Sequence, residues 1–480
     1  MTKIVKKFLI LVFWIAIWQA VAMIVDSPLL LPTPAMTVLS FVKLLGDGGF
    51  YLDALATIGR CALAIVLAVV FGALLSGMAS KWQIVRDLLS LPVAMFKAVP
   101  IMAVAIYMLF LLTAGNVPTL VCFIMCFPIV YTNLLAGLDA MNPEYLEMAK
   151  VYGLDRASIA KHIYIPSLLP YFKSAVSIIC GISWKAVVTA EVLSVPEFSL
   201  GYELMNAKYY LETDTLFAYV IAIILIAVCC ERLINMALRR LDRKEYSKSK
   251  IHRSARSAGS AGRKKISTSE NANINIDSNT KEGELNDSMN DSSDGSLEVS
   301  NLYKAFGDKI IFSDYSLRIE PGERVGLMAP SGSGKTTLLR IICGLTQADA
   351  GTVNSPRNIS VLFQEDRLLP WLNIYDNLAL VNDDIIKINN LLEAVGLEDE
   401  KFSLPEQLSG GMCHRVAMAR AFLFDAKLMI FDEPFRGLDE ETRAEVIEKL
   451  WKPGIEGRTV LLITHDPDLA KELTDRIETL

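Results

Sequence analysis

A loop that could hold nucleotide phosphates lies at residues 329–337 of the 480-residue chain. Backbone N–H groups at the start of a helix can donate to phosphate oxygens. Lys335 supplies a positive charge for the β and γ phosphates, and the Thr336 hydroxyl can bind Mg²⁺. The sequence therefore predicts a site for ATP and Mg²⁺. Its residues are Ala329, Pro330, Ser331, Gly332, Ser333, Gly334, Lys335, Thr336 and Thr337.

Two adjacent carboxylates, Asp432 and Glu433, end an apolar stretch that begins at Lys427. Asp432 is expected to hold Mg²⁺, generally through water, and Glu433 to polarise the water that attacks the phosphate. An acidic pair at a strand end can also cap a helix or form a salt bridge. The phosphate loop earlier in the chain favours the catalytic interpretation.

The apolar pattern indicates which elements position these groups. Residues 323–328 predict a buried strand that leads into the phosphate loop, and residues 336–343 predict the helix that follows it. From residue 297 onward, short β-rich runs alternate with helical ones. This alternation predicts an α/β P-loop ATPase domain at residues 297–480.

The N-terminal half has apolar windows long enough to cross a bilayer, about 20 residues each. They fall at 8–25, 57–78, 88–112, 117–138, 171–193 and 215–236. We therefore expect an all-α, six-helix transmembrane domain at residues 1–240, in the cell membrane. Lysines before the first span and basic residues after the last place both termini and the ATPase domain in the cytoplasm. They are Lys3, Lys6, Lys7, Arg239, Arg240, Arg243 and Lys244.

Between these parts, residues 241–296 contain almost no large apolar side chains. This composition predicts a disordered linker. Its basic beginning is expected to lie against anionic lipid headgroups, and a regulatory role for it stays open. The formal net charge of −6 gives no reason to expect a nucleic-acid partner.

The loop at residues 144–166, on the predicted cytoplasmic side, has a regular spacing of Glu147, Ala149, Gly153 and Pro166. Residues 143–152 predict a helix that Gly153 ends, and residues 154–162 predict a second short helix that Pro166 stops. Such an elbow would present a rigid surface to a soluble partner. The alternative is an ordinary amphipathic loop.

Three charged residues, Lys97, Lys185 and Glu191, lie inside or near the ends of predicted spans. Charge within a membrane is costly and usually faces a protein interior or a watery cavity. A place in the substrate pathway is one interpretation of these residues. A structural pair between helices, or a side chain that reaches to the membrane interface, is the other.

Residues 297–480 resemble the nucleotide-binding domain of ATP-binding-cassette transporters, through the phosphate loop, the 427–433 strand and the signature Leu408-Ser-Gly-Gly-Met412. The resemblance implies that Phe306 stacks on adenine, Gln364 touches Mg²⁺ and His465 is the switch histidine. Ser409, Gly410 and Gly411 would cap the γ-phosphate bound to the opposite subunit, and Asp439 would belong to the loop that communicates across the dimer. Ala329, Met412, Cys413 and His414 depart from the usual residues, and His414 is expected on an exposed helix face.

Residues 1–245 resemble permeases of the nitrate, sulfonate and taurine importers, through the 144–166 coupling loop, in which Met148 and Ile165 are conservative departures, and Leu30-Leu-Pro-Thr-Pro. The resemblance implies a type I importer with permease and ATPase fused in one chain. Such a unit needs a second copy of the chain and a separate extracytoplasmic binding protein. The expected solute is a sulfonate, taurine or nitrate-like anion, or a thiamine-precursor pyrimidine. The alternatives are an exporter and a membrane-anchored ATPase that transmits force without moving solute.

Overall fold

The computed structural model describes residues 3–257, 289–291, 294–328, 330 and 332–480. The chain divides into two compact units. The first is Met1–Met141 with Ser167–Tyr246, and the second is Asn142–Pro166 with Ser247–Leu480. The coupling loop thus groups with the C-terminal unit. Most of the predicted linker lies outside the described residues.

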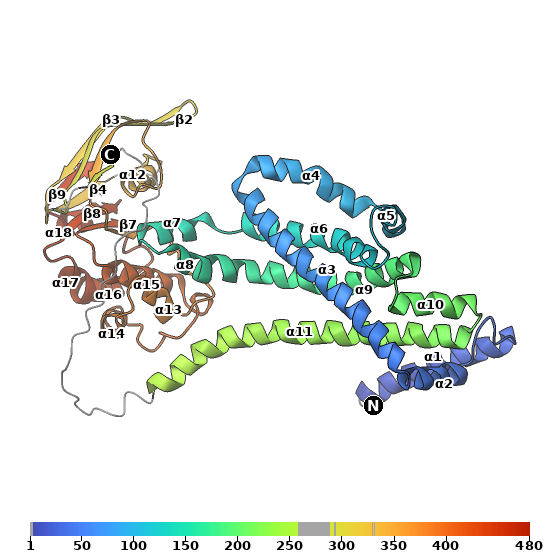
Figure 1. Ribbon diagram of the computed structural model, residues 1–480. Coiled ribbons are helices and arrows are strands. Elements are labelled where there is room, and N and C mark those ends of the chain that lie inside the picture. The colour runs from blue at the N-terminus through green and yellow to red at the C-terminus, as the bar shows by residue number, and fades with distance from the viewer. Residues whose placement is uncertain (1–2, 258–288, 292–293, 329, 331) are drawn as a thin grey trace, which may run out of the picture. The chain divides into compact units, whose positions relative to one another are not determined.

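The first unit is built from helices (Figure 1). They are α1 (Lys3–Val25), α2 (Pro34–Leu45), α3 (Gly48–Lys81), α4 (Gln83–Ala98), α5 (Ile101–Met108), α6 (Val117–Asp139), α9 (Ile165–Ser194), α10 (Leu200–Tyr209) and α11 (Thr213–Ser257). Among the described residues, five helices are long and apolar enough to cross a membrane, and the bent pair α4–α5 would make a sixth. Helix α11 continues to Ser257, through the basic stretch where the linker was expected to begin.

The predicted span at 88–112 is not one straight helix, because the chain bends by 103° between α4 and α5. Val99 has extended backbone angles (φ −72°, ψ 130°) and precedes Pro100. A residue before proline is driven away from the helical region, and proline itself has no N–H for a continuing helix. The bend therefore follows from Pro100, whereas the apolar composition alone favoured a continuous span.

Helices α3 and α6 approach closely through small residues. A Cβ atom added to Gly72 of α3 would lie 2.7 Å from a methyl carbon of Val130 in α6. Ala64 and Ala68 are fully buried in the same cluster, together with Cys122 of α6. Small residues at such contacts let helix backbones pack tightly where burial from water contributes little.

The coupling loop contains α7 (Pro143–Val151), α8 (Arg156–Ile159) and one π-helical turn (Ala160–Tyr164). Gly153 has a φ of 65°, so it ends α7 as predicted. Pro166 does not stop the second helix, and the prediction was wrong there. The Ile165 N–H bonds to the Ala160 carbonyl, and the helix continues into α9 with Pro166 in its first turn. The wider π turn and the terminal position accommodate the missing proline N–H.

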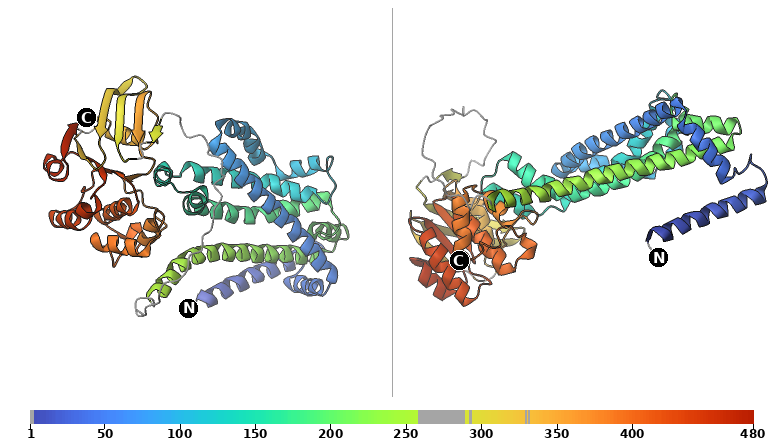
Figure 2. Two further views of the ribbon diagram at one scale, coloured as in Figure 1. Left: turned by 60° about the vertical axis from the view of Figure 1, so that its left-hand side comes forward. Right: turned by 90° about the horizontal axis from the view of Figure 1, so that it is seen from below.

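The second unit contains two sheets (Figure 1). The first, in the order β1-β5-β2-β3, has the strands β1 (Met289–Asp291), β5 (Ala350–Ser355), β2 (Leu297–Phe306) and β3 (Lys309–Ile319). The second, in the order β6-β7-β8-β4-β9, is parallel throughout and has the strands β6 (Ile359–Leu362), β7 (Leu428–Asp432), β8 (Thr459–Thr464), β4 (Arg324–Met328) and β9 (Arg476–Thr479). The left view of Figure 2 shows the first sheet, in yellow, beside the helices of this unit.

Besides α7 and α8, the α-helices of this unit include α12 (Lys335–Ile342), α13 (Ile374–Ala379), α14 (Ile385–Ala394), α15 (Gly410–Leu423), α16 (Glu440–Val446), α17 (Lys452–Gly454) and α18 (Pro467–Leu473). One apolar core joins both sheets to α12, with Leu317, Leu327, Leu338 and Ile430 all buried. A second core packs α13, α14 and α15 against β7, around the fully buried Trp451.

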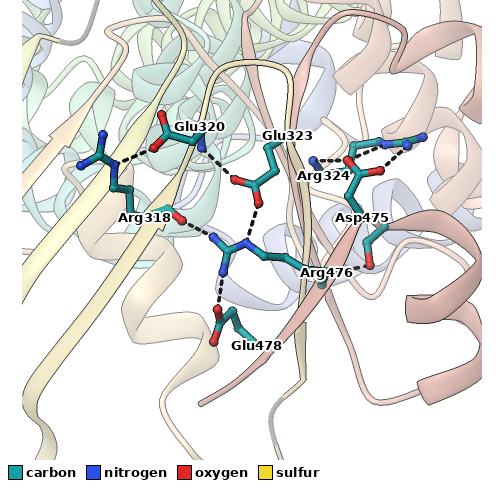
Figure 3. Close-up of polar contacts among 8 residues, drawn as sticks. Arg318, Glu320, Glu323, Arg324, Asp475, Arg476 and Glu478 are labelled. Atoms are coloured by element: carbon teal, nitrogen blue, oxygen red, sulfur yellow. Dashed lines mark hydrogen bonds and ion pairs between the residues drawn. The ribbon is translucent and has the colours of Figure 1, made fainter.

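The C-terminal strand is tied to the rest of this unit by an ionic cluster (Figure 3). Arg476 donates from Nε to Glu323 over 2.5 Å and also bonds to the Arg318 carbonyl and to Glu478. Burial alone would raise the pKa of Glu323, but the hydrogen bond from Arg476 lowers it below its ordinary value. The cluster therefore connects β9 to β3 and to the start of β4.

Candidate functional site

The carboxyl ends of β4, β7 and β8 lie at one edge of the parallel sheet, which is where such sheets bind ligands. The phosphate loop follows β4, Asp432 ends β7, and His465 follows β8. Gly334 has a φ of 105° and precedes α12, and an added Cβ there would lie 2.6 Å from Ile311. Glycine is therefore required at that position.

This edge carries a cavity of about 550 Å³. It is lined by Ile311, Gly332, Gly334, Lys335, Thr336, Thr337, Gln364, Asp432, Glu433, Arg436 and His465. The predicted phosphate, metal and catalytic residues thus meet in one place, although their sequence separation exceeds a hundred residues. Ala329 and Ser331, also predicted here, lie outside the described residues. Pro330 and Ser333 belong to the same loop without lining the cavity.

Glu433 is the centre of the charged contacts in the cavity. Its carboxylate lies 2.8 Å from His465 Nδ1 and 3.6 Å from Lys335 Nζ. Glu433 has a φ of 54°, which is unusual for a residue with a side chain, and its N–H donates to the Ile463 carbonyl over 2.9 Å. Strained backbone of this kind clusters at functional sites. The arrangement can hold a carboxylate beside the point where phosphate would be attacked.

Oxygen donors suited to Mg²⁺ line the same cavity: the Thr336 hydroxyl, the Gln364 amide and the Asp432 carboxylate. Asp432 is only 3% exposed. Burial raises the pKa of its carboxyl to about 6, an effect that Lys335 partly offsets. A cation bound here would stabilise the charged form of Asp432, so the donor set fits the predicted metal.

Two groups of predicted nucleotide contacts lie away from this cavity. Phe306 ends β2, and its ring is 54% exposed, with the Lys304 ammonium 5.1 Å from the ring centroid. Ser409 caps α15, where its hydroxyl accepts from the Met412 N–H, and Ser409 and Gly410 are exposed. An exposed signature leaves these groups available to a second copy of the chain. Asp439 caps α16 in the same manner.

His414 contradicts the expectation of an exposed helix residue, because it is only 5% exposed. Its Nδ1 lies 2.8 Å from Asp366, and its Nε2 lies 3.0 Å from the Pro434 carbonyl. Arg420, one of the largest fully buried side chains, donates to the carbonyls of Asp366 and Arg367. Helix α15 therefore holds both the segment after Gln364 and the residue after Glu433.

The coupling loop contacts the cassette through Glu147. Its carboxylate accepts from Arg340 of α12 over 2.5 Å and from Arg367 over 3.1 Å. Arg340 belongs to the helix that begins at the phosphate loop, and Arg367 lies three residues after Gln364. One carboxylate thus touches the two segments that lead to the predicted metal site.

Apolar and backbone contacts also join the coupling loop to the cassette. Met148 and Ala149 are fully buried, and the Tyr152 hydroxyl donates to the Val361 carbonyl over 2.9 Å. Trp371 donates from its indole N–H to the His162 carbonyl over 2.8 Å, and its ring meets that of Tyr145 edge to face. Sequence reasoning did not assign Arg340, Arg367, Arg420 or Trp371 to this contact. The sequence of residues 363–371 has a recognisable pattern, but this pattern does not indicate which residues the segment contacts.

The three charged residues of the membrane helices are not brought together. Lys97 in α4 and Lys185 in α9 are exposed, whereas Glu191 in α9 is fully buried. Glu191 accepts from Arg60 over 2.7 Å and from Thr57 over 3.0 Å, both in α3. These contacts favour the structural pair for Glu191. A role in the substrate pathway stays a prediction for all three residues.

Comparisons with known proteins identify the family of each part of the chain. Residues 312–436 match the family "ABC transporter", and residues 64–244 match "Binding-protein-dependent transport system inner membrane component". The chain is 42% identical to the aliphatic sulfonates import ATP-binding protein SsuB 1 of Paracoccus denitrificans, over 38% of this chain and 78% of that protein. It is 41% identical to SsuB 2 of Paraburkholderia xenovorans, over 38% of this chain and 75% of that protein.

Among solved structures, the dimeric structure of MJ0796, a bacterial ABC transporter cassette, is 30% identical in sequence, with a TM-score of 0.36 over 38% of this chain and 94% of that one. The sequence relatives are ATP-binding proteins, and the permease family covers residues 64–244 of the membrane unit. The chain therefore belongs to the ABC transporters and joins an importer-type membrane component to an ATP-hydrolysing cassette.

Proposed function

We propose that two copies of this chain form an ATP-driven importer for a small anionic solute of the organic sulfonate class. The observation that carries the proposal is the position of the Glu147 carboxylate, which accepts hydrogen bonds from both Arg340 and Arg367. It gives the loop between two membrane helices a direct contact with both the phosphate-loop helix and the Gln364 segment. A conformational change at the nucleotide could therefore act on the coupling loop.

The proposed stoichiometry of two chains is supported by the layout of the site. Each chain has one phosphate loop and one signature, and the signature residues lie outside the cavity. If each signature completes the site of the other copy, a symmetric pair has two ATP sites. Closing and opening of this sandwich would drive the permease helices between two states. Solute would arrive on a separate binding protein outside the cell.

Within each site, the residues have distinct proposed roles. Lys335 and the backbone around Gly332 and Gly334 bind the phosphates, and Glu433 orients the attacking water while His465 holds its carboxylate. Mg²⁺, held by Thr336, Gln364 and Asp432, would neutralise phosphate charge when bound. Phe306 would support the adenine ring.

The solute class rests on two supports. The relatives of the cassette are named as aliphatic sulfonate import proteins. Lys97 and Lys185 add positive charge to the membrane unit, which suits an anion. Taurine belongs to the same class, whereas nitrate and a thiamine-precursor pyrimidine are the competing solutes. Both termini and the cassette would lie in the cytoplasm, as the basic residues that flank the helices indicate.

The test is solute accumulation by proteoliposomes that contain the full chain, with ATP inside and a loaded binding protein outside. We expect one sulfonate-loaded binding protein to stimulate ATP hydrolysis and to give uptake. The Glu433→Gln variant should do neither. Activity that ignores every binding protein and expels hydrophobic compounds would favour export. Hydrolysis stimulated by a binding protein without solute movement would favour a force-transmitting ATPase.

A further inference from the structure

Arg436 lies in the turn that follows the proposed catalytic carboxylate. Its backbone N–H donates to the Glu433 carbonyl over 3.2 Å, and the Leu438 N–H then donates to the Phe435 carbonyl over 3.3 Å. The first contact closes a four-residue turn, in which the end Cα atoms lie within about 7 Å of each other. The position of Arg436 is therefore fixed relative to Glu433.

The turn directs one long side chain toward the cavity. Pro434 and Phe435 are buried, and Gly437 has no side chain and a φ of 73°. Arg436 is exposed and lines the same cavity as Lys335, Thr336 and His465. Of these four residues, only Arg436 offers a planar group with several N–H donors on a long, flexible stem.

The charged contacts that the structure describes in the cavity do not include the Arg436 guanidinium. Lys335 lies 3.6 Å from the Glu433 carboxylate, which also contacts His465. Over the described part of the chain, no carboxylate forms an ion pair with Arg436. Asp432 and Glu433 place two negative charges beside the proposed phosphate site, which Lys335 and a Mg²⁺ bound by Asp432 would offset. The Arg436 guanidinium adds a further positive charge that is available to the phosphate.

We propose that Arg436 binds the terminal phosphate of ATP. A guanidinium group can donate two parallel hydrogen bonds to phosphate oxygens, which a lysine ammonium cannot do. The Arg436 backbone is hydrogen-bonded to Glu433. This inference rests on the proposed function, in which Glu433 lies beside the attacked phosphorus, so the γ-phosphate would be the group within reach of Arg436. The α and β phosphates would lie with the loop at the start of α12. Arg436 thus distinguishes ATP from ADP, whereas Lys335 serves both.

The test compares the binding of a β,γ-imido ATP analogue with that of ADP, using the full-length chain in nanodiscs. We expect Arg436→Ala to weaken binding of the analogue about tenfold or more, the change expected when a charge-assisted contact is lost. Its affinity for ADP should stay within about twofold. Arg436→Lys should fall between wild type and Arg436→Ala, since it keeps the charge without the paired donors.

Two further variants make the result interpretable. Arg443→Ala removes a partly exposed arginine of α16, 4.0 Å from Asp466, and should leave the binding of both nucleotides unchanged. Lys335→Ala should weaken the binding of both nucleotides. Unchanged binding in this variant would contradict the proposed nucleotide site itself. If the Lys335→Ala control behaves as expected, two results for Arg436→Ala would overturn the assignment. One is an unchanged affinity for the analogue, and the other is an equal loss of affinity for the analogue and for ADP.

Discussion

The Glu147 carboxylate lies 2.5 Å from one guanidinium nitrogen of Arg340 and 3.1 Å from one of Arg367. Arg367 is only 3% exposed at its side chain, and its guanidinium also stacks 3.6 Å from the Phe363 ring centroid. A buried guanidinium without its carboxylate is unfavourable. Glu365 lies 3.5 Å from Arg367 within the same segment, whereas Glu147 brings the coupling loop to both Arg367 and Arg340.

Replacing Glu147 by Gln should uncouple ATP hydrolysis in the cassette from stimulation by a loaded binding protein. The variant keeps the size of the side chain but loses its charge, so both arginine contacts weaken by about 1.5–3 kcal/mol each. We expect stimulation of ATP hydrolysis by a loaded binding protein to fall about tenfold or more. Unstimulated hydrolysis should change by no more than about twofold, because Glu147 does not line the nucleotide cavity.

Glu144→Gln is the matched control. Glu144 belongs to the same helix, and its carboxylate accepts from Asn142 within the coupling loop. Stimulation should survive in this variant. Equal stimulation in the Glu147→Gln and wild-type proteins, measured in the same nanodiscs, would show that the carboxylate is not needed for coupling.

The elements that carry the motifs were predictable because local pattern and chemistry agree there. The strand expected at 323–328 is β4 at Arg324–Met328, and the helix expected at 336–343 is α12 at Lys335–Ile342. Parallel strands place their carboxyl ends at one edge, so Lys335, Asp432 and His465 converge even though they are far apart in sequence.

The burial of His414 and the partner of Glu191 could not be predicted from the local sequence. His414 is buried because Asp366 and Pro434 come to it from segments that no local pattern connects with α15. The partner of Glu191 is likewise on another helix, at Arg60. Burial and pairing depend on tertiary contacts, whereas helix and strand periodicity report only the sequence nearby.

His414→Ala should destabilise the cassette. Both ring nitrogens face acceptors, and truncation would leave the Pro434 carbonyl without a donor in a buried place. Such a loss costs about 1–3 kcal/mol, or about 2–4 °C in Tm per kcal/mol for a domain of this size. We expect Tm to fall by several degrees and hydrolysis to fall with it, because α15 also positions the signature.

Cys413→Ala provides the comparison for this loss. Cys413 precedes His414 on the same helix and makes one weak contact, from Sγ to the Pro405 carbonyl over 3.4 Å. Its removal should lower Tm much less. Thermal unfolding in detergent can rank the two variants. An unchanged Tm for His414→Ala would mean that the two contacts contribute nothing measurable.

Asp432→Asn should stabilise the nucleotide-free protein above pH 6. Burial raises the folded pKa of Asp432 to about 6, and an unfolded Asp has a pKa of about 3.9. The folded state therefore binds the proton more tightly, and stability decreases as pH rises from about 4 to about 6. The difference is at most about 3 kcal/mol at pH 8, since each pKa unit corresponds to about 1.36 kcal/mol.

Thermal unfolding of the Asp432→Asn chain at pH 8 and pH 5, without nucleotide or Mg²⁺, measures this effect. We expect a higher Tm than wild type at pH 8 and a much smaller difference at pH 5. Asp425→Asn, at an exposed position before β7, should leave Tm unchanged at both pH values. Hydrolysis should nevertheless be lost in Asp432→Asn. A lower Tm at pH 8 would indicate that the carboxylate stabilises the fold instead.

Arg60 and Glu191 should behave as a pair. Glu191 is fully buried, and Arg60 also donates to the carbonyls of Glu197 and Phe198, so the pair holds α3 to the loop after α9. Removing one partner leaves an unpaired buried charge, which costs about 3–5 kcal/mol. We expect Arg60→Met and Glu191→Met to lower Tm and membrane yield strongly. The double variant should recover much of the loss, because neither charge remains.

The Glu191→Gln variant separates this structural role from a place in the substrate pathway. A neutral amide can still accept from Thr57 and from the Gly201 N–H, which contacts Glu191 over 3.2 Å. If Glu191 only supports the fold, uptake should decline in proportion to the folded protein. A Glu191→Gln chain that keeps the wild-type Tm but transports no solute would instead place this carboxylate in the pathway, because its charge would then be needed for movement of the solute.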